Sequence, residues 1–255
     1  MRTCALASGS SGNAFYIEND KNAILIDAGI SSKQIVERLN NNGKNAEKIK
    51  AIFVTHEHID HVRGIDVFAR MFNVPIFLTR KTAENCFVCS DKSLINFIKN
   101  NETVHIAGFD VNAFSKPHDC VDPVSYSIQG DKTVSIITDI GHASKNVCNA
   151  VSDSDLLFVE SNHDSHMLIN GPYPASLKKR ILSKYGHLSN FQSSICLLEH
   201  ASSRLKNIVL AHLSEVNNTP NIAMRTMQNL IKERKDLKPK ICVSGRYEAT
   251  ELFRV

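Results

Sequence analysis

Apolar residues occur in short runs that alternate with amphipathic stretches along the whole chain. Runs of four or five residues that are rich in Ile, Val and Phe and bounded by Gly, Asn or Asp predict β-strands. We expect strands at residues 3–7, 14–18, 23–27, 51–55, 76–79, 104–107, 110–114, 124–128, 134–138, 156–160, 208–211 and 241–244. The first strands follow one another as a meander, whereas strands and helices alternate in the middle and at the end.

Helical spacing of apolar residues, together with capping signals, predicts five helices between these strands. Ser31 is expected to cap a helix that runs to Asn42 and stops at Gly43, and Asn190 to cap one that reaches about His200. The other three are expected at residues 60–72, 174–185 and 221–235. The pattern favours an α/β fold of two sheets with outer helices, in a single domain over residues 1–255.

The composition narrows the class of protein. Hydrophobic residues make up 42% of the chain, enough to build a core. No apolar stretch approaches the ~20 residues that span a bilayer, and residues 8–12 interrupt the apolar N-terminus too early for a signal peptide. The seven cysteines are odd in number and scattered, which favours reduced thiols. We therefore expect a soluble cytoplasmic protein without a membrane segment, and the net charge of +4 is compatible with an anionic substrate.

Four potential metal ligands lie within six residues of one another: His56, His58, Asp60 and His61. They follow the predicted buried strand at 51–55 and precede a predicted helix, so they occupy a strand-to-helix turn at a sheet edge, where ligand sites of α/β proteins concentrate. Residues two apart in an extended segment point the same way, so His56 and His58 can share one metal. Asp60 and His61 then address a second metal, and this donor set suits zinc, manganese or iron.

The run Thr55-His56-Glu57-His58-Ile59-Asp60-His61 resembles the HxHxDH signature of the metallo-β-lactamase superfamily. The resemblance extends over nearly the whole chain and implies an αββα sandwich of two mixed β-sheets flanked by helices, with a dinuclear metal site. It implies that Asp27 supports the ligand loop and that three further residues complete the metal site, which are His118 on the first metal, Asp139 bridging both, and His212 on the second.

A closer resemblance is to the YycJ/WalJ (VicX) group of this superfamily. It rests on Ser8-Gly9-Ser10-Ser11-Gly12-Asn13, His118-Asp119 followed by Asp122-Pro123-Val124, Glu160-Ser161-Asn162-His163-Asp164, Gly186-His187-Leu188-Ser189-Asn190 and His212-Leu213-Ser214. The group implies a DNA exonuclease acting from the 5′ end. Asp139 and His212 are only about 73 residues apart, which excludes the β-CASP insertion of RNase J-like enzymes. An RNase Z-like tRNA arm is absent as well, so any polymer must be gripped by the core.

Three further places are candidates for substrate contact. Residues 8–13 offer Ser8, Ser10 and Asn13 as a phosphate cradle, although a tight turn between two strands explains the same glycines. His163 follows a predicted strand, where it is a candidate to contact the scissile phosphate or protonate the leaving oxygen, although a satisfied turn histidine fits the position equally well. His187 stands at a helix entry, where either substrate contact or capping fits. The basic run Lys178, Lys179, Arg180 and Lys184 is interpreted as a solvated helix face.

The implied mechanism is two-metal hydrolysis of a phosphodiester, in which Asp60 orients a hydroxide and carries its proton. The alternative on the same fold is hydrolysis of a small phosphodiester, thioester or lactone. A redox di-iron protein is disfavoured, because those relatives carry glutamate where this chain has His58. The two metals are zinc or manganese, a choice that these ligands leave open, and the partner is a nucleic acid, with DNA favoured. The oligomeric state is not determined by the sequence.

Overall fold

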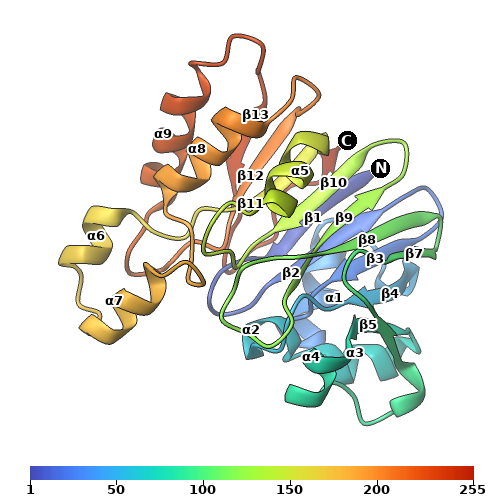
Figure 1. Cartoon of the computed structure of the whole chain (residues 1–255). Coiled ribbons are helices and arrows are strands. Elements are labelled where there is room, and N and C mark those ends of the chain that lie inside the picture. The colour runs from blue at the N-terminus through green and yellow to red at the C-terminus, as the bar shows by residue number, and fades with distance from the viewer. The chain divides into compact units, whose positions relative to one another are not determined.

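The computed structural model describes all residues 1–255, and its strands belong to two mixed seven-stranded sheets flanked by helices. The chain forms two compact units (Figure 1). Unit 1 comprises Met1–Ser115, Cys120–Asp131 and Ser244–Val255, and unit 2 comprises Lys116–Asp119 and Lys132–Val243. The prediction of an α/β fold with two mixed sheets and outer helices is confirmed, whereas a single domain over 1–255 stays a prediction.

Unit 1 contains one complete seven-stranded sheet in the order β14-β1-β2-β3-β4-β5-β6. The pairs from β14 to β3 are antiparallel and those from β3 to β6 are parallel. The strands are β1 Arg2–Ala7, β2 Ala14–Glu18, β3 Ala23–Ile26, β4 Ile49–Phe53, β5 Ile76–Thr79, β6 Ile95–Ile98 and β14 Phe253–Arg254. Every residue of β2 and β3 is buried, which explains why these strands appear as continuous apolar runs in the sequence.

Helices cover one face of this sheet. They are α1 Ser32–Asn41, α2 Ile59–Val62, α3 Ile65–Phe72 and α4 Arg80–Asn85, with short 3-10 turns η1 Ala46–Lys48 and η2 Lys92–Leu94. Ile35 and Leu39 of α1 and Phe68 of α3 share a core with Ile52 of β4 and with Val54, which follows that strand directly. Successive strand residues point to opposite faces, so the residue between them, Phe53, faces away from this core.

The other face of the sheet packs on three antiparallel strands of the same unit, β7 Thr103–Ile106, β8 Phe109–Ser115 and β9 Val124–Gln129. Phe53 makes an edge-on contact with Tyr126 of β9 at a ring-centroid distance of 5.4 Å. The Tyr126 hydroxyl donates a hydrogen bond of 2.7 Å to the Val54 carbonyl. Two sheets therefore lie face to face within unit 1, as the predicted sandwich requires.

Unit 2 is built on four parallel strands in the order β13-β12-β11-β10. They are β10 Thr133–Ile137, β11 Leu156–Glu160, β12 Asn207–Ala211 and β13 Lys240–Val243. The helices of this unit are α5 Lys145–Asp153, α6 Ser165–Asn170, α7 Ala175–Ile181, α8 Asn190–His200 and α9 Pro220–Ile231. Helices α5, α8 and α9 pack against the strands and one another, whereas α6 and α7 lie away from the sheet within this unit (Figure 1).

Several predicted boundaries hold and one helix prediction is wrong. Ser31 caps α1 with a capping box to Gln34, as its spacing indicates. The single helix expected at 60–72 is broken into α2 and α3 at Gly64, whose amide donates 2.7 Å to the Ala28 carbonyl. A Cβ there would lie 2.1 Å from the Ile30 carbonyl oxygen, so the close approach of these segments decides the break. No helix has the length and apolar character to cross a membrane.

Candidate metal centre

The run of ligands in unit 1 lies where β4 ends and α2 begins. His56 is fully buried, and its Nε2 lies 3.1 Å from Nδ1 of His58. The His56 and His61 rings are 4.0 Å apart between centroids, and Nε2 of His61 lies 3.5 Å from Oδ2 of Asp60. The structure therefore brings all four residues of this run together in one turn of chain.

Asp27 supports this run from the end of β3, as the resemblance implies. Its fully buried carboxylate accepts hydrogen bonds from the amide of Thr55 at 2.8 Å and from the Thr55 hydroxyl at 2.9 Å. Oδ2 of the same carboxylate lies 2.7 Å from Nδ1 of His61. A histidine held through Nδ1 by a carboxylate has a fixed ring orientation and coordinates through Nε2.

The turn at residues 8–13 touches the ligand run through Asn13. The Asn13 side-chain nitrogen lies 3.3 Å from Oδ2 of Asp60 and 3.1 Å from Nε2 of His61. The side-chain oxygen of Asn13 accepts bonds from the Gly9 amide and the Ser8 hydroxyl. Ser8 and Asn13 thus form the tight-turn arrangement considered from the sequence, while Ser10 is exposed and accepts a bond from Arg246.

Unit 2 contributes a second group of ligands from the ends of its parallel strands. One ligand atom from each of Asp139, Glu160, His187 and His212 lies within 4.8 Å of the others. Oδ1 of Asp139 is 3.4 Å from Nε2 of His212 and 4.0 Å from Nδ1 of His187. Sequence reasoning placed Asp139 and His212 among the metal ligands, but it left His187 between substrate contact and capping and gave Glu160 no role.

Glu160 organises this group in the way that Asp27 organises the run in unit 1. Its Oε1 lies 3.0 Å from Nδ1 of His212 and 2.8 Å from Nδ1 of His187. Burial by itself would raise the pKa of Glu160, but the charges and hydrogen bonds of His187 and His212 together lower it to about 2. The carboxylate is therefore ionised at neutral pH. The signal in the sequence was an acidic residue that ends an otherwise apolar strand.

Backbone amides donate further hydrogen bonds to the Glu160 carboxylate. Oε2 accepts from the amides of Ile140 and Leu188, both at 3.0 Å, and Oε1 accepts from the amide of Asp139 at 3.2 Å. One carboxylate consequently fixes the loop that bears Asp139 and the segment that bears His187.

His118 lies in the short stretch of unit 2 at Lys116–Asp119. Its Nε2 is 3.9 Å from Oδ1 of Asp139, and its Nδ1 is 3.3 Å from the Gly186 carbonyl oxygen. Burial lowers the pKa of His118 to about 3, so the ring is neutral at pH 7, which is the form that binds metals.

His163 is placed differently from the other histidines. Its side chain is 1% exposed, and neither ring nitrogen has a hydrogen-bond partner in the protein. Burial lowers its pKa to about 4. Its backbone carbonyl accepts from the Asn190 amide at 2.8 Å, which ties it to the start of α8. A buried polar ring without a partner is costly, and such groups recur at functional sites.

Three of these residues have unusual backbone conformations. Asp27, Asp139 and His212 have φ values of 59°, 58° and 55°. The left-handed region is uncommon for residues other than glycine and costs on the order of 1–3 kcal/mol each where it is strained. All three follow the last residue of a strand by one or two positions, so the turn aims each side chain off the strand end.

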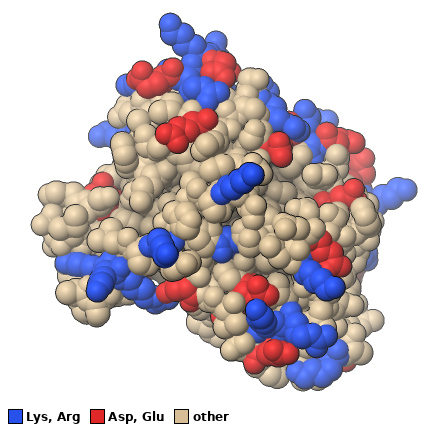
Figure 2. Space-filling view, in the orientation of Figure 1, with Lys and Arg blue, Asp and Glu red and all other residues tan.

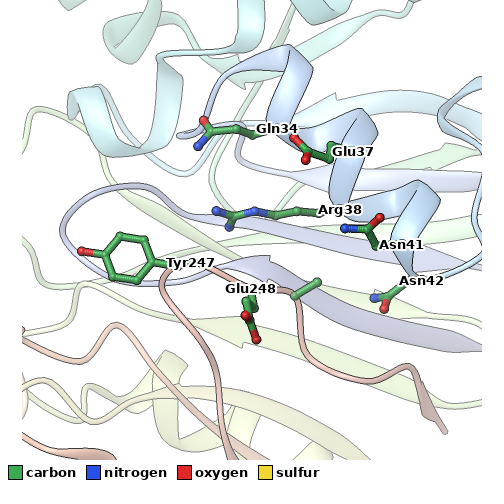
Figure 3. A pocket seen from close by; sticks show the side chains of 8 residues that line it. Gln34, Glu37, Arg38, Asn41, Asn42, Tyr247 and Glu248 are labelled. Atoms are coloured by element: carbon green, nitrogen blue, oxygen red, sulfur yellow. The ribbon is translucent and has the colours of Figure 1, made fainter.

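A polar pocket of about 430 Å³ occurs elsewhere in unit 1, between α1 and the C-terminal stretch (Figure 3). Arg38 crosses it and donates hydrogen bonds to the carbonyls of Leu6 and Arg246. Its lining contains none of the predicted metal ligands. This pocket therefore has no part in the predicted metal site.

Comparisons with known proteins agree with these features. The family model of the metallo-beta-lactamase superfamily matches residues 7–137. Exodeoxyribonuclease WalJ of Streptococcus pneumoniae serotype 2 is 37% identical over 234 residues, which cover 89% of this chain and 87% of that protein. Exodeoxyribonuclease YycJ of Bacillus anthracis is 32% identical over 235 residues, with 90% and 88% covered.

A comparison with solved structures finds the same fold. The metallo-beta-lactamase fold protein YhfI from Bacillus subtilis superposes with a TM-score of 0.72 at 14% identity, and 98% of each chain is covered. The match to the family model spans more than half of the chain, and this chain is similar to each of the two exodeoxyribonucleases over most of its length. This chain therefore belongs to the metallo-β-lactamase superfamily.

Proposed function

We propose that this chain is a metal-dependent phosphodiesterase that degrades DNA exonucleolytically from the 5′ end. The relatives named exodeoxyribonuclease WalJ and YycJ, which are similar over about nine-tenths of the chain, support this proposal. The observation that carries it is that two buried carboxylates, Asp27 and Glu160, each bind Nδ1 of a predicted metal ligand. That arrangement is typical of histidines that hold metal through Nε2.

The donor set fits two divalent cations. Imidazole and carboxylate ligands suit zinc and manganese alike. As the resemblance to the superfamily implies, His56, His58 and His118 would hold one cation and Asp60, His61 and His212 the other, with Asp139 as a further ligand. The low pKa of His118 and the ionised Glu160 favour the neutral-imidazole and carboxylate forms that coordinate metals.

Bound cations would lower the pKa of the attacking water and neutralise charge on the phosphoryl oxygens. Asp60 is proposed to orient that water and to accept the proton that it loses, and the Asn13 side chain beside Oδ2 of Asp60 holds the carboxylate in position. His163 is proposed to contact the scissile phosphate. Because its pKa is about 4, its ring is neutral at pH 7 and donates a hydrogen bond from one N–H.

The remaining predicted substrate contacts divide into two kinds. Ser10 is exposed and available to a phosphate, whereas Ser8 and Asn13 are buried and act by shaping the turn. His187 is held by Glu160 and lies beside Asp139, so we propose that it faces substrate or metal at the edge of the unit 2 ligand group.

The test is a nuclease assay on metal-free protein reloaded separately with Mn²⁺ or Zn²⁺. Substrates are single- and double-stranded DNA and RNA that carry a label at the 5′ or the 3′ end. The variants are Asp60→Asn and His58→Ala, and matched controls are Asp131→Asn and His105→Ala, which change exposed residues of unit 1. We expect metal-dependent shortening that only the first two variants lose.

The labels give the polarity, and mononucleotide release from the 5′ end is the expected pattern. Absence of polymer cleavage, together with hydrolysis of bis(p-nitrophenyl) phosphate or a thioester, would move the function to a small substrate. Equal activity of Asp60→Asn and wild type would contradict the assigned metal site.

A further inference from the structure

Unit 2 contains a basic segment that the reaction itself does not use. Residues 175–186, called the basic segment below, include Lys178, Lys179, Arg180 and Lys184. The surrounding residues 165–198 contain no Asp or Glu. The formal charge of this stretch is therefore +4, equal to the net charge of the whole chain, so the other residues sum to zero. The net positive charge of the chain is therefore concentrated in this stretch, and the charges of the remaining residues cancel.

The basic segment is packed against the loops that carry predicted metal ligands in the same unit. A Cβ on Gly141, two residues after Asp139, would lie 2.4 Å from the carbonyl carbon and oxygen of Lys184. The Lys184 carbonyl oxygen is 2.8 Å from Nδ1 of His142. Only glycine permits this approach of two backbones, so the position of the segment beside the Asp139 loop is fixed by the fold.

A second attachment joins the segment to the His118 loop. The Arg180 guanidinium pairs with the carboxylate of Asp119, the residue after His118. The carbonyl of Gly186 lies 3.3 Å from Nδ1 of His118. The middle and the C-terminal end of the basic segment are thus anchored next to two different ligands of the proposed reaction centre.

Several side chains of the basic segment are exposed to solvent. Lys179 and Lys184 are exposed and form no ion pair, and Tyr185 is 47% exposed with the Lys184 ammonium 5.1 Å from its ring centre. Leu182 between them is 52% exposed. Figure 2 shows Lys and Arg atoms gathered over α7. An exposed aromatic ring among lysines next to a hydrolytic centre matches what a nucleic-acid strand needs, which is cations for phosphates and a flat surface for a base.

We propose that the basic segment binds the DNA strand that enters the reaction centre, with Lys179 and Lys184 on its phosphates and Tyr185 stacked on a base. This inference rests on the proposed nuclease function and adds the surface that grips the polymer. Arg180 serves as the anchor, since its charge is shared with Asp119. The lysines act by electrostatic attraction, which is independent of base sequence and weakened by salt.

The test measures binding of a fluorescent single-stranded DNA to metal-free protein by anisotropy over a series of salt concentrations. The test variant is Lys179→Gln with Lys184→Gln, and the matched control is Lys235→Gln with Lys238→Gln, two exposed lysines of the same unit. We expect the test pair to weaken binding about five- to tenfold and to make the slope of log K against log salt shallower by about 1.4–1.8. Tyr185→Ala is expected to weaken single-strand binding about fivefold.

Each result has a distinct meaning. Equal weakening by the test and control pairs would overturn the proposal, because binding would then follow net charge alone. The proposal would also be overturned if the wild type cleaves DNA and the Lys179→Gln, Lys184→Gln variant binds DNA as tightly as the wild type, a result that would leave the nuclease function intact. A wild type that neither binds nor cleaves any polymer would refute both. Circular dichroism of the variants checks that the fold is kept.

Discussion

Oδ2 of Asp27 lies 2.7 Å from Nδ1 of His61, and both side chains are completely buried. The two residues are 34 positions apart in the chain and meet because β3 and β4 are parallel neighbours whose ends share one sheet edge. Asp27 also holds Thr55, so a single carboxylate fixes both the start and the end of the ligand run.

Replacing Asp27 by Asn should reduce metal affinity, because the amide cannot act as a charged acceptor for His61. We expect about a 10- to 100-fold loss, the usual effect of removing a carboxylate that supports a metal-binding histidine. The measurement is metal content after equilibration with a graded series of chelator concentrations. Asp66→Asn, which changes a carboxylate of unit 1 paired with Arg70 on the surface, is the control. Retention of metal by both variants alike would refute the role of Asp27.

Glu160 offers a parallel prediction in unit 2. Glu160→Gln should also lower metal affinity about 10- to 100-fold. The control is Asp155→Asn, because Asp155 is a buried carboxylate near the opposite end of the same strand that binds Arg204 and Thr133. Both changes should lower the midpoint of thermal unfolding, but only the first should release metal. If Asp155→Asn released metal to the same extent, general destabilisation would explain the effect.

Gly29 is predicted to be essential for the geometry of the unit 1 ligands. A Cβ at this position would lie 1.6 Å from the carbonyl oxygen of Asp60 and 2.7 Å from the amide nitrogen of Asn13. Gly29→Ala must displace Asp60, and we expect a loss of about 3 kcal/mol in the free energy of unfolding. Gly43→Ala is the control, because its φ is +66° and nothing lies near its Cβ. Urea denaturation should show a loss of only about 1 kcal/mol there.

The pH dependence of stability should show that His163 is buried in its neutral form. Its pKa is about 4 in the folded protein, against the ordinary histidine value of 6.5 in the unfolded chain, so only the unfolded chain takes up this proton between those values. Stability of the metal-free protein is therefore unaffected above pH 6.5, falls as the pH drops, and has lost about 3 kcal/mol from this group once the pH is below 4.

The variant His163→Phe isolates this contribution, because the ring nitrogens have no partners to lose. We expect the variant to match wild type in stability at pH 7, to exceed it by about 1–2 kcal/mol at pH 5, and to have lower turnover. Denaturant unfolding at the two pH values gives the comparison. Parallel pH curves for the two proteins would show that His163 does not remain neutral in the fold.

Much of the architecture was predictable because its signals are local. Strands buried on both faces appear as short apolar runs, and the box formed by Ser31 and Gln34 marks the start of α1 within four residues. The helix at 60–72 was the failure, since its apolar spacing carries no sign of the neighbouring Ile30 carbonyl that forces a break at Gly64. The helices expected at 174–185 and 221–235 also end earlier than predicted, at Ile181 and Ile231.

The sequence by itself determined the ligand run His56–His61, because residues so near in the chain stay near in any fold that puts a turn after a strand. It also determined the family, through the run His56–His61 and the later motifs around His118, Asp139 and His212, which resemble those of the superfamily. Only the tertiary structure decided that Glu160 positions His212, that Asn13 contacts Asp60, and that a basic segment lies against the Asp139 loop. The residues of each pair are separated by tens of positions in the chain. Glu160 meets His212 because their parallel strands end at a common edge, and the basic segment approaches the Asp139 loop because Gly141 has no side chain.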